Sequence, residues 1–153
     1  MNWLELRVPP LAVVFVTGVL MWLADLALPR LRMELPGRSV AAIALALAGS
    51  FCALAGVIEF RRARTTTNPM KPDGASTLVT GGIYTRTRNP MYLGFVLVLL
   101  GWGAYLQSSA SFFLPPAFVL YMNRFQIGPE ERILVGIFGD AFAAYRAKVR
   151  RWL

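Results

Sequence analysis

Histidine is absent from this sequence of 153 residues, and cysteine occurs once. Histidine is the commonest general base near neutral pH and a common metal ligand, so any chemistry on this chain must work without imidazole. The single cysteine, Cys52, excludes an intrachain disulfide and a thiolate metal cluster. We therefore expect no metal centre. Carboxylates, tyrosine, lysine and Cys52 remain as the groups that could exchange protons in catalysis.

Acidic residues are also scarce: Asp and Glu total 8 against 16 Lys and Arg, which gives a formal net charge of +8. Such a balance could indicate a nucleic-acid partner, but here the basic residues flank apolar runs. That placement is typical of contacts with anionic lipid headgroups. Anionic membrane lipids are therefore the expected partners, and nucleic acid is not.

Apolar residues make up 56% of the chain, and the mean hydropathy is +0.52. A soluble domain averages about 45–50% apolar residues, so the excess indicates a second apolar solvent, which is lipid. The length suits one domain and leaves no room for a separate soluble catalytic module. The sequence therefore predicts an integral membrane protein.

Four apolar runs predict an all-α polytopic protein with about four transmembrane helices, at about 11–28, 40–58, 91–106 and 112–125. The second run is rich in Ala and Gly, which let helix backbones approach closely in lipid. We expect the first two helices, in residues 1–60, to pack on each other as a hairpin. The last two runs are short and tightly linked, so they predict a short helical hairpin. The sequence leaves open whether that hairpin spans the bilayer fully.

The last segment, 129–153, is amphipathic and predicts an interfacial cytoplasmic helix. Gly136 and Gly139 weaken its continuity, so two shorter helices are an alternative. Apolar residues recur along it at helical spacing: Ile133, Leu134, Ile137, Phe138, Phe142, Tyr145 and Val149.

Lys and Arg residues predict the orientation. The long polar stretch 61–89 and the C-terminal tail are basic, which places both on the cytoplasmic side, together with the N-terminus. Arg30, Arg32 and Arg38 in the first loop oppose this orientation but are fewer. We expect the chain in the inner membrane of a bacterial or archaeal cell.

The densest group of polar residues, 78–94, lies where the long stretch enters the third apolar run. Pro90 suits the first position of a helix and Asn89 suits the N-cap. The free N–H groups of that helix start, with the Arg88 guanidinium, would form a receptor for an anionic group. The alternative is that Arg88 only anchors the helix to lipid headgroups.

A second group, Glu130 and Glu131, follows Gly128 and Pro129. Paired acids bind an ammonium or sulfonium cation, and they also stabilise the start of a helix at a proline, so both roles are open. Three tyrosines could line a pocket or anchor the chain at the membrane interface: Tyr84, Tyr92 and Tyr145. Asp25 and Glu59 lie near helix ends, and their roles stay open. Three glycines indicate close helix packing: Gly94, Gly101 and Gly103.

Together these groups resemble the isoprenylcysteine carboxyl methyltransferase family, whose relatives include phospholipid N-methyltransferases. The resemblance covers about residues 65–153. Its pieces, in order, are Leu78-Val79, Gly82-Ile83-Tyr84, Arg88-Asn89-Pro90-Met91-Tyr92-Leu93-Gly94, Glu130-Glu131, and Tyr145 through Val149 to Arg151. Order and spacing both fit the family pattern.

The resemblance implies that residues 61–153 form a methyltransferase core that binds S-adenosylmethionine in a cytoplasm-facing pocket. It assigns catalytic roles to Arg88 and Glu131. It assigns cofactor contacts to Val79, Gly82, Tyr84, Asn89, Tyr92, Gly94, Glu130, Glu131 and Tyr145. In two places, Ser76 and Asn89, this chain lacks a histidine of the family pattern, which puts a true prenylcysteine substrate in doubt.

A sulfonium methyl group is already activated, so the reaction needs mainly alignment, and a carboxylate acceptor needs no general base. The absence of histidine therefore favours carboxyl O-methylation of a lipophilic acceptor that enters from the bilayer. Two alternatives remain: a membrane reductase using NADPH on a sterol-like lipid, and a non-catalytic scaffold that binds anionic lipid. The sequence leaves the oligomeric state open.

Overall fold

The computed structural model describes residues 4–65 and 72–153. Within these ranges the regular structure is helical, apart from one isolated bridge between Arg32 and Ser108. The all-α prediction is therefore confirmed for this part of the chain.

Five α-helices follow in order: α1 (Pro10–Ala27), α2 (Arg38–Arg62), α3 (Pro90–Leu106), α4 (Leu114–Tyr121) and α5 (Gly128–Lys148). Short 3₁₀ turns include η3 (Gly82–Thr85), and a π-helix, η5 (Met122–Ile127), joins α4 to α5. Helices α1 and α2 are long and apolar enough to cross a membrane, whereas α3 is a shorter apolar helix. A full crossing by α3 and α4 stays a prediction.

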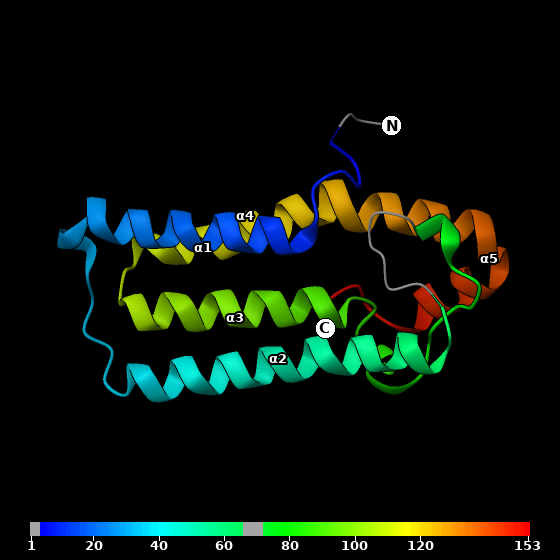
Figure 1. Ribbon diagram of the computed structural model, residues 1–153, viewed down its shortest axis with the longest axis horizontal. Helices are drawn as coiled ribbons and strands as arrows, with labels where there is room; N and C mark the ends of the chain where they lie inside the picture. The colour runs from blue at the N-terminus through cyan, green and yellow to red at the C-terminus, as the bar shows by residue number, and fades with distance from the viewer. Residues whose placement is uncertain (1–3, 66–71) are drawn as a thin grey trace.

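Helix α3 lies between α2 on one side and the pair α1 and α4 on the other (Figure 1). The main helix–helix contact joins α2 to α3, while α1 packs on α3, α4 and the short turn before α4. The prediction that the first two helices pack on each other is therefore wrong. Small residues on α2 do permit a close approach, but the partner is α3.

Close backbone contact explains why α2 packs on α3 and not on α1. A Cβ added at Gly49 would lie 2.5 Å from the Gly94 carbonyl oxygen, and one added at Gly101 would lie 2.9 Å from the Ala42 carbonyl oxygen. Only residues without a Cβ allow two helices to approach so closely, and in lipid such packing is a main source of association. Gly94 and Gly101 thus have the packing role that the sequence indicated.

Helices α4, η5 and α5 form one continuous rod, so the expected helix start at Pro129 is wrong (Figure 1). Proline has no N–H for the carbonyl four residues earlier, which here belongs to Phe125. The Leu6 N–H donates to that carbonyl at 3.0 Å instead. The π-helix ends two residues before Pro129, as expected where a proline disturbs helical hydrogen bonding. Glu130 and Glu131 therefore follow a bulge in a helix and do not cap a free end.

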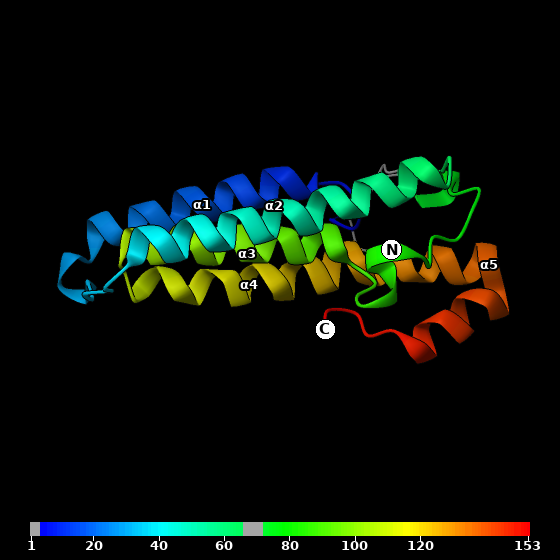
Figure 2. The same ribbon diagram turned by 90° about the horizontal axis from the view of Figure 1, so that it is seen from below.

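Gly139 breaks α5 with φ +49° and ψ −123°, a conformation that L side chains rarely adopt. The chain then folds back toward the bundle, and its C-terminus lies near the start of α3 (Figure 2). The sequence-based alternative of two shorter helices is therefore the one observed. Whether this segment lies in the membrane interface stays a prediction.

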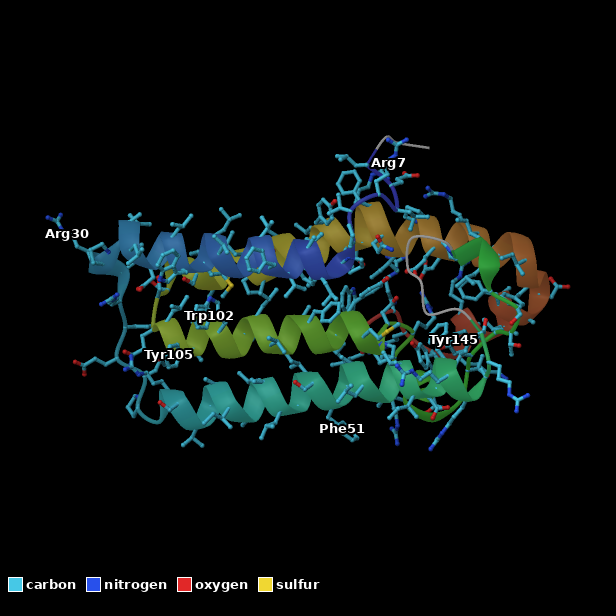
Figure 3. All side chains as sticks on the ribbon, in the orientation of Figure 1. Arg7, Arg30, Phe51, Trp102, Tyr105 and Tyr145 are labelled. Carbon is cyan, nitrogen blue, oxygen red and sulfur yellow. The ribbon has the colours of Figure 1, made fainter. Side chains whose placement is uncertain are left out.

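The outer surface of the bundle is apolar. Phe15, Phe51 and Phe113 are more than 70% exposed, and Figure 3 shows Phe51 pointing away from the other helices. Trp102 by contrast points between the helices and donates from Nε1 to the Gly18 carbonyl of α1 at 3.1 Å. Large exposed apolar side chains around a helical bundle are expected where lipid is the solvent.

Polar contacts close the bundle end that carries Arg30 in Figure 3. Asp25 is buried and accepts two hydrogen bonds from Arg32, at 2.9 and 2.7 Å. The Met33 N–H donates to the Gln107 carbonyl at 2.8 Å, so the two loops at this end are tied together. Asp25 thus has a structural partner far from the residues of the predicted site.

Gly94→Ala should lower the stability of the protein by about 1–3 kcal/mol, because the new methyl group would overlap the backbone of α2. Thermal unfolding in detergent measures the change. Gly18→Ala is the matched control, because a Cβ there meets nothing within 4 Å. The control should be neutral or slightly stabilising, since alanine is the better helix former. Equal melting temperatures for the two variants would contradict the packing assignment.

Candidate active site

A cavity lies at the end of the bundle opposite to the Asp25 ion pair, where the start of α3 meets η3 and α5. It contains about 680 Å³ of atom-free space, a figure that includes open solvent at its mouth. Its wall is made by Phe60, Ala75, Thr77, Leu78, Val79, Tyr84, Arg88, Asn89, Met91, Tyr92, Ile127, Glu130, Glu131, Leu134, Phe142 and Tyr145.

Most of the residues predicted from the sequence meet in this one cavity. They come from three separate parts of the chain, namely the loop before η3, the start of α3, and α5. The predicted residues in the wall are Val79, Tyr84, Arg88, Asn89, Tyr92, Glu130, Glu131 and Tyr145.

Two predicted cofactor contacts, Gly82 and Gly94, are not in the cavity wall. Gly82 has φ +56°, and a Cβ added there would lie 2.5 Å from the Glu59 Cδ of α2. Gly94 lies against Gly49 in the α2–α3 contact. Gly94 is buried in that helix contact, whereas Gly82 is exposed but packs against Glu59 outside the cavity wall. Glu59 itself pairs with Arg62 at 2.9 Å.

The Glu131 carboxylate binds two arginines. Its Oε1 accepts from Arg88 Nη2 at 2.7 Å and from Arg151 Nε at 3.1 Å, and its Oε2 accepts from Arg151 Nη2 at 2.6 Å. The Arg88 and Glu131 side chains are only 10% and 12% exposed. Charge-assisted bonds in such a setting are strong and hold both partners in one geometry.

Arg88 also holds the C-terminal tail. Its Nη1 donates to the carbonyls of Val149 at 2.7 Å and Arg146 at 3.1 Å, and its backbone N–H donates to the Arg150 carbonyl at 3.0 Å. Asn89 occupies the N-cap position of α3, as predicted, but its side chain does not cap the helix. Its Nδ2 donates to the Arg151 carbonyl at 2.9 Å instead. Donors of Arg88 and Asn89, at the predicted anion receptor, therefore bind carbonyl oxygens of the C-terminal tail.

Glu130 differs sharply from its neighbour. In the described part of the chain its carboxyl group receives hydrogen bonds from the Tyr92 hydroxyl, at 3.1 and 3.3 Å, and no ion pair to it is present. Burial, and to a lesser extent the charge of Glu131, raises the pKa of Glu130 to about 8. At neutral pH this carboxyl group is therefore mostly protonated.

The pKa of Glu131 is lowered, whereas the pKa values of the cavity tyrosines are raised. Burial by itself would raise the pKa of Glu131, but the bonds from Arg151 and Arg88 outweigh it and hold the pKa below the usual 4.5. Burial raises the pKa of Tyr145 to about 12 and that of Tyr84 further. Tyr145 donates from its hydroxyl to the Tyr84 carbonyl at 2.8 Å. Neither tyrosine is a ready base near pH 7.

The sequence-based site omitted Arg151, which completes the cluster around Glu131, and the buried Phe142 of the cavity wall. A signal for Arg151 was present, because this residue ends the Tyr145–Val149–Arg151 pattern that carried the resemblance. Phe142 stood among the apolar residues of the last helix, where helical spacing alone does not distinguish a cavity wall from a lipid-facing position.

A helical membrane bundle with this polar cavity at one end belongs to the class of membrane methyltransferases, because a sequence model of phospholipid methyltransferases matches residues 38–141. The chain belongs to the phospholipid methyltransferase family, which includes the isoprenylcysteine carboxyl methyltransferases. The matched residues run from α2 through the cavity to the break in α5. The family resemblance inferred from the sequence is therefore confirmed.

Two individual proteins share part of the sequence. An uncharacterised protein of Haemophilus influenzae is 44% identical over 63 residues, which are 41% of this chain and all of that protein. A protein-S-isoprenylcysteine O-methyltransferase of Schizosaccharomyces pombe is 41% identical over 75 residues, or 47% of this chain. The match covers only 30% of the yeast enzyme. No solved structure shows a significant similarity.

Glu131→Gln should destabilise the protein by about 3–5 kcal/mol, because it leaves Arg88 charged, buried and without a counter-ion. Thermal unfolding in detergent measures the loss, and faster tryptic cleavage at the C-terminal arginines reports release of the tail. Glu34→Gln, an exposed acid at the other end of the bundle, is the matched control and should change neither. A native-like tail in Glu131→Gln would show that the ion pairs do not hold it.

Acid should remove the stabilisation that the ion pairs of Glu131 provide. Because the pKa of Glu131 is lowered, its ion pairs stabilise the fold fully above the ordinary value of 4.5, and the stabilisation is lost as pH falls below that value. The charge of Glu131 contributes to the raised pKa of Glu130, so the comparison is made below pH 7, where Glu130 is mostly protonated. The difference in melting temperature between native and Glu131→Gln proteins should be constant between about pH 5 and pH 7 and shrink below pH 4.5. A difference that is undiminished at pH 3 would contradict this assignment.

Proposed function

We propose that this protein is a methyltransferase that uses S-adenosylmethionine to methylate a lipophilic acceptor at the cytoplasmic face of the membrane, with carboxyl O-methylation favoured. One observation carries the proposal. Residues of both sequence motifs, separated by about 40 positions, line a single cavity that contains an unpaired acid, a buried arginine and aromatic walls.

The residues of the cavity fit the cofactor by their chemistry. The Glu130 carboxyl group, which has no cationic partner in the described chain, suits the sulfonium or ammonium group. The buried Arg88 Nε has no hydrogen-bond partner among the described residues, and we assign it to a carboxylate oxygen of the acceptor and not of the cofactor. Tyr84, Phe142 and Tyr145 offer aromatic surface for a planar base.

When bound, S-adenosylmethionine supplies a methyl group on a positively charged sulfur, which an acceptor displaces directly. The chain then has to align the acceptor and exclude water. Glu131 and the tail carbonyls fix the Arg88 guanidinium, and the unpartnered Nε of Arg88 is the donor that can hold an acceptor carboxylate. No proton has to leave a carboxylate acceptor, which agrees with a cavity that contains no imidazole.

An acceptor with an apolar tail suits the surroundings of the cavity. Met91, Ile127 and Leu134 contribute apolar surface to its wall, and the neighbouring bundle exposes large apolar side chains of the kind that face lipid. The exposed basic residues near the tail, Arg146, Lys148 and Arg150, suit contact with anionic headgroups on the cytoplasmic side. The acceptor would then reach the cavity from the bilayer while the cofactor arrives from water.

A second acceptor class is an amine of a phospholipid headgroup, because phospholipid methyltransferases give the matching family its description. An amine must lose a proton before or during methyl transfer, and the cavity offers only carboxylates and tyrosines for that task. This requirement favours the carboxyl acceptor, and the experiment below distinguishes the two.

Purified protein in detergent, given methyl-labelled S-adenosylmethionine and a lipid extract, should transfer label into the lipid fraction. Methyl esters release labelled methanol in mild alkali, whereas methylated amines do not, so alkali treatment identifies the acceptor atom. Alkali-stable label would support the amine. The absence of transfer, together with binding of NADPH, would support the reductase alternative, and binding of neither would support a lipid-binding scaffold.

Arg88→Lys should lower the rate of transfer about 100-fold or more, because lysine keeps the charge but lacks both the fork geometry and Nε. Arg86→Lys is the matched control. Arg86 is an exposed neighbour two residues earlier that does not line the cavity, so its replacement should leave the rate unchanged. Equal loss in both variants would mean that the effect of replacing arginine does not depend on its place in the cavity.

A further inference from the structure

In the ligand-free cavity, Glu130 makes no hydrogen bond with the described residues that requires an acid rather than a glutamine. Glu131 holds Arg88 in place, and Arg88 would hold the acceptor, whereas the hydrogen bonds that Glu130 receives from the described residues come from the Tyr92 hydroxyl. A glutamine side chain would fill the same space and accept the same hydrogen bond from Tyr92. The presence of an ionisable group at this position therefore needs its own explanation.

The geometry separates the two neighbouring acids. Arg88 and Arg151 point three hydrogen bonds at Glu131, which keeps that carboxylate charged. Glu130, one residue earlier, lines the cavity beside Ile127 and Leu134 and faces the hydroxyl of Tyr92. Glu130 is half-buried, and a carboxyl group that is partly withdrawn from water with no cation beside it is more stable in its neutral form.

The groups around Glu130 agree with a neutral carboxyl in the ligand-free cavity. Tyr92 of α3 donates to it, and the negative charge of Glu131 in α5 opposes its ionisation. Burial together with that charge raises the pKa of Glu130 to about 8. The other titratable groups of the cavity wall and of the elements packed on it are Tyr84 of η3, Arg88, Tyr145 of α5, and Arg151 of the tail, with Glu59 of α2 behind Tyr84.

We propose that Glu130 carries a proton in the empty cavity and releases it to solvent when a sulfonium cation binds, so that the site distinguishes the charged methyl donor from its neutral thioether product. The proposal rests on the function given above. On binding, the O–H bond of the carboxyl group breaks, the proton passes to a buffer molecule, and the carboxylate faces the cation. After methyl transfer the sulfur is neutral, and the carboxylate takes up a proton again.

This coupling fixes the sign of the pH dependence. Below about pH 8 the donor must displace a proton, so its affinity should rise by up to about tenfold for each pH unit and level off above pH 8. The product, S-adenosylhomocysteine, has the same amino and carboxylate groups but no charge on sulfur. Its affinity should therefore lack this component, and the donor should gain on the product as pH rises.

Isothermal titration calorimetry of the 153-residue chain in detergent tests the proposal directly. At pH 7, titration with S-adenosylmethionine in buffers of low and high ionisation enthalpy, such as phosphate and Tris, gives the number of protons released. We expect close to one proton per site for S-adenosylmethionine and about none for S-adenosylhomocysteine. This measurement needs only the native protein, so it does not depend on whether a variant folds.

Glu130→Gln should abolish proton release, make the affinity for S-adenosylmethionine independent of pH between 6 and 8, and bring the affinities for donor and product together. Asp140→Asn is the matched control. It removes an exposed acid in the same helix and outside the cavity wall, so proton release should remain. Persistence of proton release in Glu130→Gln would overturn the assignment to Glu130.

The outcomes separate this inference from the function on which it rests. Binding of S-adenosylmethionine without proton release would overturn the coupling and leave the methyltransferase proposal intact. Equal proton release with donor and product would show that Glu130 answers to the shared amino group, which also overturns the selectivity for sulfonium. A protein that binds neither compound at any pH would defeat the methyltransferase proposal, and the role of Glu130 would fail with it.

Discussion

The carboxylate of Glu131 between two guanidinium groups is the interaction on which the geometry of the cavity depends. Its partners lie 43 residues before it and 20 residues after it, so one side chain joins the start of α3, the beginning of α5 and the tail. A buried ion pair of this kind is often no more stabilising than well-packed apolar residues. Its value here is that it fixes the direction of Arg88, whose other N–H groups hold the tail against the cavity.

Two irregularities in the last helical segment make this cluster possible. The π-helix η5 before Pro129 alters the helical register just ahead of the acids, and a buried Glu5 braces the segment through Arg124 at 2.9 Å and Arg132 at 2.6 Å. Gly139 then turns the chain back through a conformation open to glycine. Without that reversal Arg151 would lie far from Glu131. Features that usually weaken a helix therefore create the third side of the cavity.

The sequence predicted helix starts well where the chemistry is local. Pro90 begins α3 and Asn89 precedes it, because a missing N–H is harmless only at a helix start. The sequence did not predict which helices pack together. The small residues of α2 permit close packing on either α1 or α3, and in the structure they contact α3. The sequence brought Arg88 and both acids to one site, yet it could not divide the roles of Glu130 and Glu131. That division depends on which acid the tail arginine reaches, and this follows from the π-helix and the break at Gly139.

The contrast between the two acids also bears on catalysis. Methyl transfer from a sulfonium to a carboxylate joins a cation and an anion and leaves two neutral products, so the transition state has less charge than the bound reactants. A site with strong fixed charges of both signs would stabilise the reactants more than the transition state and slow the reaction. Glu131 is already neutralised by its arginines. Under the proposed coupling, Glu130 is charged only while a cation faces it, and such a cavity would bind a charged donor without keeping a permanent negative charge beside the reacting sulfur.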